Sequence, residues 1–240
     1  MQSQNLTINV AGTAMPCYLA APSEGKHPAV IVLQEIFGVN KEMRRVADLL
    51  ATSGYVALVP NFYYRTDPDL AAPYTPEGAQ VGMKAAASVT RATLKADLSA
   101  TIDWLNDQDF VSFGHIATWG FCLGGSVAFY SATMPGIAAA AAFYGTSIAR
   151  QTHSGEPEML ADAADLRAPV LLVFGGQDES IPPESIARIE QTLASAGKRF
   201  EVQVYPEVGH AFFRGNEPDH HVAESADAWE RVQAFFRKHL

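Results

Sequence analysis

Short apolar runs alternate with segments of helical periodicity along most of this 240-residue chain. Strands that alternate with helices form a mostly parallel sheet with helices on both faces. The pattern therefore predicts an α/β fold with a doubly wound sheet. The predicted strands are residues 28–34, 55–60, 115–119, 138–144, 170–174 and 200–205, and the predicted helices are residues 41–53, 93–106, 123–130 and the amphipathic segment after residue 222.

Two segments depart from this alternation. Residues 6–10 and 14–20, joined by Ala11-Gly12, are typical of an antiparallel hairpin at the start of the sheet. Residues 61–92 are rich in Tyr, Pro and polar residues, and this stretch is too long for a plain connection. We expect it to be an excursion that covers the active site as a lid or pocket wall. Without repeats, low-complexity tracts or linkers, residues 1–240 are predicted to form a single domain.

The charge balance narrows the choice of partners. The formal net charge is -9, and no run of Lys or Arg exceeds a dipeptide, which argues against binding to nucleic acid or to an anionic membrane surface. The N-terminus has neither a basic region nor an apolar stretch of the kind found in secretory signals. We expect a cytoplasmic protein, and we favour a monomer.

Of the two cysteines, Cys17 and Cys122, we expect Cys122 to be a free thiol, because a domain of this size needs no disulfide.

The strongest local motif is residues 119–125, W-G-F-C-L-G-G, which follow a predicted strand and precede a predicted helix. This arrangement is typical of a nucleophile elbow, G-x-nucleophile-x-G, with Cys122 in the position that serine usually takes. Glycines permit the sharp turn and the close approach of neighbouring backbone. A position at a helix N-terminus favours negative charge on the sulfur. The alternative is a buried, inert cysteine in a glycine-rich turn.

Two further residues complete a candidate catalytic triad. Asp178 follows the strand at 170–174, although Glu179 is a rival and an ordinary turn aspartate is the alternative. His210 follows the last predicted strand and precedes the apolar pair Phe212-Phe213. The chain order nucleophile, acid, histidine is that of α/β-hydrolases. We therefore predict that Cys122 attacks a carbonyl while His210, oriented by Asp178, transfers the proton.

The chain resembles the dienelactone hydrolases (carboxymethylenebutenolidases) essentially from end to end. The resemblance is carried by Q-E-I-F-G at 34–38, G-F-C-L-G-G at 120–125, G-G-Q-D at 175–178 and G-H-A-F-F-R at 209–214. It implies the α/β-hydrolase fold and an ester or lactone hydrolase that uses neither a metal nor a cofactor. The substrate it implies is a small carboxylate-bearing enol-lactone such as carboxymethylenebutenolide, opened to maleylacetate in aromatic degradation.

The resemblance also implies a role for Glu35, at the end of the third strand, in contact with the nucleophile. A carboxylate at the end of an apolar strand is costly without a partner. Its charge beside Cys122 would oppose thiolate formation until something displaces it, so Glu35 is expected to position or deprotonate the thiol. The alternative is a structural carboxylate bonded to backbone amides or to Arg44 or Arg45.

The remaining site residues concern the substrate. The oxyanion hole would consist of the backbone N–H groups of Leu123 and Ile36. By resemblance, Arg214 would hold a substrate carboxylate, a task that suits a guanidinium, and a surface arginine is the alternative. Phe37 and Lys84 are further expected substrate contacts.

The sequence departs from the family pattern at two places. It has no arginine in residues 75–87, where the family's type member has one, and it has Ala211 where a hydroxyl residue follows the histidine. Both differences concern the substrate rather than the hydrolytic residues.

Other functions remain open at this stage. The chain could hydrolyse another ester, thioester or lactone, or it could be a non-catalytic ligand-binding module on the same fold. The complete Cys, His and Asp set favours an enzyme over a binding module. A thiol redox role is less favoured, because the sequence has no C-x-x-C motif.

Overall fold

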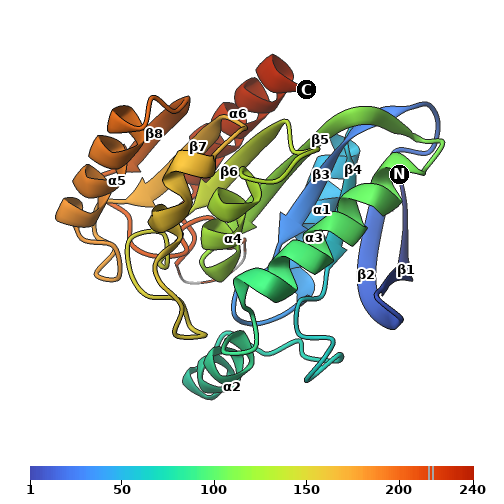
Figure 1. Ribbon diagram of the computed structural model, residues 1–240, viewed down its shortest axis with the longest axis horizontal. Helices are drawn as coiled ribbons and strands as arrows, with labels where there is room; N and C mark the ends of the chain where they lie inside the picture. Colours follow the sequence, from blue (N-terminus) through green and yellow to red (C-terminus); the bar gives the residue numbers. More distant parts are fainter. Residues whose placement is uncertain (216, 218) are drawn as a thin grey trace.

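The computed structural model describes residues 1–215, 217 and 219–240, which form a single eight-stranded sheet in the order β1-β2-β4-β3-β5-β6-β7-β8 (Figure 1). β1 and β2 form the predicted antiparallel hairpin, and β2 also pairs antiparallel with β4. All other neighbouring strands are parallel. The strands are β1 Gln2–Val10, β2 Thr13–Ala21, β3 His27–Leu33, β4 Val56–Pro60, β5 Val111–Phe121, β6 Ala139–Phe143, β7 Val170–Gly175 and β8 Phe200–Tyr205.

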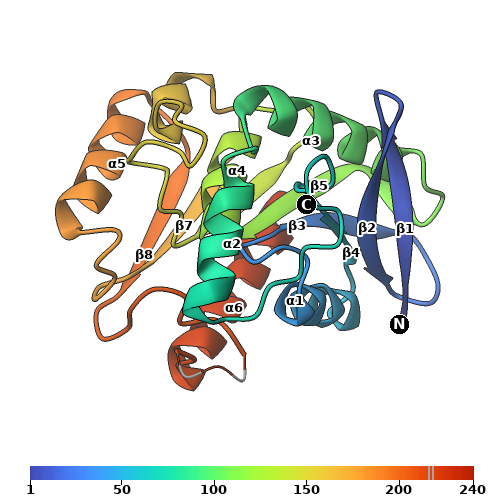
Figure 2. The ribbon, with the colours of Figure 1, turned by 90° about the horizontal axis from the view of Figure 1, so that it is seen from below.

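Helices cover both faces of the sheet. α1 and α6 lie on one face, and α3, α4 and α5 lie on the other (Figure 2). The helices are α1 Lys41–Thr52, α2 Pro76–Ala86, α3 Arg91–Asn106, α4 Leu123–Ser131, α5 Pro183–Ser195 and α6 Val222–His239, with a 3-10 helix at Met159–Asp165. Within the described ranges, none of these helices has the length and apolar character needed to cross a membrane.

The central strands are buried on both faces, which explains why they appear in the sequence as continuous apolar runs. β4, β6 and β7 have no exposed residue. Trp119 of β5 is fully buried and stacks on Trp229 of α6 at a centroid distance of 5.3 Å. The predicted α/β-hydrolase fold with its N-terminal hairpin is confirmed. α2, α5 and the 3-10 helix were not predicted.

Residues 61–92 contain α2, which lies beyond the end of the sheet toward which β3 points (Figure 1). Thr75 caps this helix by accepting a hydrogen bond from the N–H of Gly78, and Pro76 occupies its first turn. Gly82 packs closely on the loop after β3, since a Cβ there would lie 2.4 Å from the carbonyl oxygen of Ile36. A larger residue at position 82 would therefore push the helix away from this loop.

The first end of this excursion is tied to the middle of α3. The Arg65 guanidinium donates to both carboxylate oxygens of Asp97, at 2.9 and 2.7 Å. The hydroxyl of Tyr64 donates to the same carboxylate at 3.0 Å. Asp97 is almost completely buried, so it depends on these partners for compensation of its charge.

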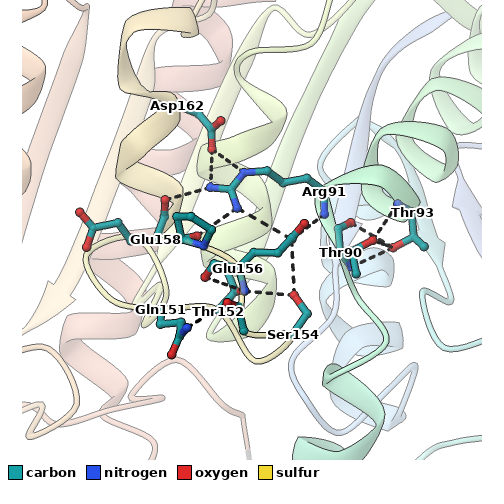
Figure 3. A network of polar contacts seen from close by, with 11 residues as sticks. Thr90, Arg91, Thr93, Gln151, Thr152, Ser154, Glu156, Glu158 and Asp162 are labelled. Carbon is teal, nitrogen blue, oxygen red and sulfur yellow. Dashed lines mark hydrogen bonds and ion pairs between the residues drawn. The ribbon is translucent and has the colours of Figure 1, made fainter.

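The second end is tied by Arg91, the first residue of α3 (Figure 3). Its guanidinium donates to Asp162 at 2.9 and 2.7 Å and to the carbonyl oxygens of Pro157 and Glu158 at 3.0 and 2.9 Å. Its backbone N–H donates to Glu156 at 2.8 Å. The excursion thus leaves from and returns to fixed points on the same helix.

Candidate active site

Five polar residues lie at the carboxyl ends of neighbouring parallel strands. Glu35 follows β3, Cys122 follows β5, Tyr144 follows β6, Asp178 follows β7 and His210 follows β8. Open α/β sheets bind ligands at this edge, because the loops there converge from successive strands. Residues that are 175 positions apart in the sequence, such as Glu35 and His210, therefore share one site.

Cys122 occupies a strained turn between β5 and α4. Its φ and ψ of 54° and -112° are unusual for a residue with a side chain, and its N–H donates to the carbonyl oxygen of Phe143 at 3.1 Å. A Cβ on Gly120 would lie 1.9 Å from the oxygen of Gly124, and one on Gly124 would lie 2.0 Å from that of Leu33. The prediction that close backbone approach requires glycine at both positions is confirmed.

The two cysteines differ in their surroundings, and both are free thiols. Cys17 lies in β2, and burial raises the pKa of its thiol to about 12. Its sulfur donates to the carbonyl oxygen of Met15. Cys122 is 8% exposed and lies at the N-terminus of α4.

Asp178, rather than Glu179, contacts His210. The Nδ1 atom of His210 lies 2.6 Å from Oδ2 of Asp178, whose Oδ1 accepts the N–H of Ser180 at 2.8 Å. Asp178 is 4% exposed, whereas Glu179 is an exposed residue. The two carboxylate oxygens of Asp178 are therefore fixed by different donors, and the imidazole is fixed with them.

The charge state of His210 depends on the groups around it. Burial alone would lower its pKa, but electrostatic interaction with Cys122 and the hydrogen bond with Asp178 raise it to about 10. His210 therefore holds its proton more tightly than an ordinary histidine. The ring of Tyr144 packs edge-on against the imidazole at a centroid distance of 5.1 Å.

Glu35 is 1% exposed and has two hydrogen-bond partners among the described residues. Nε of Arg214 donates to its two oxygens at 3.0 and 3.3 Å, and the Tyr74 hydroxyl donates at 2.7 Å. The contact with Cys122 that the resemblance implies is not among these hydrogen bonds. The alternative partners were also wrong, since Arg45 pairs with Glu42 at 2.6 Å and Arg44 donates to Asn5 at 3.1 Å.

Arg214 is mostly buried, at 11% side-chain exposure, so it is not a surface arginine. Its guanidinium lies 4.3 Å from the ring centroid of Tyr74 and 5.2 Å from that of Phe37. Apart from Asp219, whose carboxylate lies 3.6 Å from Nη1, no described residue pairs with its terminal nitrogens. Arg214 therefore keeps donors for a further anion, and Phe37 lies beside it.

The N–H groups of the expected oxyanion donors have no acceptor among the described residues. No described residue accepts a hydrogen bond from the N–H of Ile36. Leu123 is the first residue of α4, where a helix has no acceptor of its own for the N–H group. Lys84, by contrast, is exposed on the side of α2 opposite Gly82, so the structure does not place it with the other site residues.

A cavity of about 370 Å³ opens beside the histidine, and its lining includes Asp178, His210, Arg214 and Asp219. Within the described part of the chain, no three His, Cys, Asp or Glu side chains are grouped so that they could hold a metal ion.

The sequence analysis missed two tyrosines of this site. Tyr74 belongs to the aromatic excursion, and Tyr144 is the residue that follows β6. Tyr144 has a positive φ of 39° and is 1% exposed, and no described residue forms a hydrogen bond with its hydroxyl. Its position directly after a strand is the same signal that indicated Asp178, so it could have been noticed.

A parallel sheet with helices on both faces, and a cysteine at a strand-to-helix elbow, define an α/β-hydrolase. The model of the dienelactone hydrolase family matches residues 15–240. The chain belongs to this family, whose members are hydrolases that act on esters and lactones. It is therefore an enzyme and not a non-catalytic binding module.

Several relatives are similar over nearly the whole chain. A protein of Synechocystis sp. named "Putative carboxymethylenebutenolidase" is 33% identical over 98% of this chain and 94% of its own length. A protein of Escherichia coli with the same name is 36% identical over 97% of this chain and 86% of its own. A crystal structure described as a "Putative Dienelactone Hydrolase" from Klebsiella pneumoniae superposes with a TM-score of 0.88 at 31% identity, covering 98% of both chains.

Proposed function

We propose that this enzyme hydrolyses a carboxylic ester or lactone through a thioacyl-enzyme, with Cys122 as nucleophile, His210 as acid and base, and Asp178 as the group that orients His210. The observation that carries the proposal is the 2.6 Å contact between His210 and Asp178, made by an imidazole whose pKa is also raised by Cys122 at the elbow. The three residues come from three different strand ends, as a site assembled for chemistry requires.

The first half of the reaction forms the thioester. The Cys122 thiolate attacks the carbonyl carbon, and the N–H groups of Ile36 and Leu123 stabilise the oxyanion of the tetrahedral intermediate. When the C–O bond breaks, His210 gives its proton to the leaving oxygen. In the second half, His210 takes a proton from water, the hydroxide attacks the thioester, and the Cys122 thiolate leaves. A lactone would yield a single ring-opened acid.

Arg214 supports a substrate that carries a carboxylate. It lines the same cavity as His210, and its terminal nitrogens are not hydrogen-bonded to any described residue. A small anionic enol-lactone, as in the name carboxymethylenebutenolidase of the relatives, fits this arrangement best. An ester, thioester or lactone of another kind is the alternative, because the excursion that lines the site has no arginine between residues 75 and 87.

For Glu35 we propose a positioning role. Its carboxylate holds Arg214 and Tyr74 at the side of the site, so it can act on the Cys122 thiol after one of them moves away. Phe37 packs against both partners of Glu35 and would help to keep them in place.

The test is a search for the covalent intermediate. Enzyme mixed rapidly with 4-nitrophenyl acetate should release a burst of nitrophenol equivalent to the active sites, and mass spectrometry of the quenched protein should find the acetyl group on Cys122. Cys122→Ala should show neither. Turnover at the wild-type rate in Cys122→Ala would contradict the covalent mechanism, and turnover of esters but not of dienelactone would favour the alternative substrates.

A further inference from the structure

A second cavity lies near the cavity beside His210. It has a volume of about 660 Å³, and its lining includes Tyr74 and Gly215. The cavity of about 370 Å³ beside His210 is lined by Arg214, the residue before Gly215. The two cavities therefore meet at consecutive residues of the loop that follows β8.

Arg214, which lines the cavity beside His210, stacks on Tyr74, which lines the second cavity. The Arg214 guanidinium lies 4.3 Å from the ring centroid of Tyr74, and the edge of the Phe37 ring packs against Tyr74 at 4.7 Å between centroids. The hydroxyl of Tyr74 is held by Glu35 at 2.7 Å. The two linings therefore meet through side chains, so a substitution can open this contact without breaking a strand or helix.

We propose that Tyr74 determines substrate specificity: its ring closes the cavity beside His210 against the second cavity and so limits the length of the substrate beyond the reacting ester or lactone group. This inference rests on the proposed function, because it concerns the substrate of the same site. Tyr74 comes from the excursion, whereas its partners Glu35 and Arg214 come from loops of the sheet. The excursion therefore selects substrates by placing one aromatic ring.

The lining of the second cavity indicates what could enter it. Ala71, Ala72 and Pro73 form an apolar part next to Tyr74. The charged part holds two cationic and two anionic side chains, which balance in formal charge: Lys41, Glu42, Arg45 and Glu217. Because neither sign of charge prevails, the lining suits an uncharged alkyl or alkoxy chain better than a second carboxylate.

The first experiment compares Tyr74→Ala with Tyr74→Phe. Each variant is assayed on 4-nitrophenyl esters from acetate to octanoate, and on acetates of alcohols of increasing length. In Tyr74→Ala, the ratio of kcat/KM for the longest to the shortest ester should rise at least about tenfold in one of the two series, since single methylenes in a fitting pocket have effects of this size. Tyr74→Phe keeps the ring, so its ratio should stay at the wild-type value while its pH profile changes.

The ratio within one variant does not depend on the fraction of protein that is folded or active. A Tyr74→Ala ratio equal to that of wild type in both series would overturn the proposal. So would an equal rise in Tyr74→Phe, because the effect would then come from the lost hydrogen bond to Glu35 rather than from the opened contact.

A double variant tests where the long chain lies. Ala71 lines the second cavity, and Ala71→Trp in the Tyr74→Ala background should narrow that cavity and lower the ratio toward the wild-type value. A persistent gain in the double variant would mean that the chain lies elsewhere, which would also overturn the proposal.

A second readout needs no ester turnover. N-methyl and N-hexyl iodoacetamide alkylate a reactive cysteine irreversibly, and the relative rates at Cys122 can be followed by mass spectrometry. Tyr74→Ala should raise the rate for the hexyl reagent relative to the methyl reagent, and Tyr74→Phe should not. If the enzyme alkylates in this pattern without hydrolysing esters, the proposed function fails while the role of Tyr74 stands. Unchanged relative rates in Tyr74→Ala would overturn that role.

Discussion

Nε of Arg214 donates to Oε1 of Glu35 at 3.0 Å, although the two residues are 179 positions apart in the chain. Both side chains are buried, so removing one partner leaves an uncompensated charge. We expect Arg214→Met to lower the free energy of unfolding by ~3–5 kcal/mol in urea denaturation. The double variant Arg214→Met/Glu35→Gln should recover part of this loss. An additive or greater loss in the double variant would mean that the pair does not stabilise the fold in this way.

Arg214 should also discriminate between substrates by charge. If the substrate carries a carboxylate, a charge-assisted pair with Arg214 contributes about 1.5–3 kcal/mol. Arg214→Ala is then expected to reduce kcat/KM about ten- to a hundredfold for an anionic lactone, and little for a neutral ester of similar size. Arg231→Ala is a matched control, because Arg231 lies on α6 and is 48% exposed. Equal losses for both substrates would assign Arg214 a structural role.

The two cysteines should differ sharply in reactivity. At neutral pH, iodoacetamide should modify Cys122 first, since Cys17 is buried and its pKa is raised to about 12. Cys17→Ala should keep ester turnover within a few-fold of wild type, whereas Cys122→Ser should lose most of it because the site is built around a larger, more acidic nucleophile. Peptide mapping of the labelled protein identifies the modified residue. Preferential labelling of Cys17 would contradict the assignment.

His210 should titrate far above an ordinary histidine. Its pKa of about 10 is raised from 6.5 by Cys122 and Asp178, so Cys122→Ala should lower it. NMR titration of histidine-labelled protein measures both values. Because the folded-state pKa is the higher one, proton binding at His210 stabilises the fold. This stabilisation is complete below pH 6.5 and is lost as the pH rises toward 10. The stability difference between wild type and His210→Asn should decrease over the same range.

Two glycines of the site should respond differently to alanine. A Cβ on Gly124 would lie 2.0 Å from the backbone oxygen of Leu33, whereas the nearest atom to a Cβ on Gly209 would be 3.8 Å away. We expect Gly124→Ala to lower the free energy of unfolding by about 3 kcal/mol or more, and Gly209→Ala to keep a melting temperature near that of wild type. Differential scanning calorimetry compares them. Similar melting temperatures would contradict the steric role of Gly124.

The sequence was sufficient for the elements whose signals are local. The strands of the parallel sheet are apolar runs, and the elbow around Cys122 is marked by its glycines. The order of Cys122, Asp178 and His210 placed them at the ends of three different strands, and the structure brings Asp178 and His210 into contact. Local sequence also favoured Asp178 over Glu179.

The partners of Glu35 could not be predicted in the same way. Arg44 and Arg45 are near in sequence, but they lie on α1, where Arg45 pairs with Glu42 one helical turn away. The actual partners, Tyr74 and Arg214, come from an excursion and from a loop after the last strand. Contacts between loops depend on how each loop packs, and this packing leaves no periodic pattern in the sequence from which it could be predicted. Lys84 shows the same limit, because its side of α2 was fixed by the packing of Gly82 on Ile36.

The anchors of residues 61–92 have a consequence for how such an enzyme can diverge. Tyr64 and Arg65 hold one end of the segment on Asp97, and Arg91 holds the other end on the 156–162 loop. The cost of closing a loop grows slowly with its length, so a segment with both ends fixed can be lengthened, shortened or exchanged while the sheet keeps its register. Because Tyr74 lies within that segment, each exchange would replace a neighbour of Glu35 together with the wall of the pocket. New substrate ranges could then arise by recombination of one cassette, without a change in the hydrolytic residues.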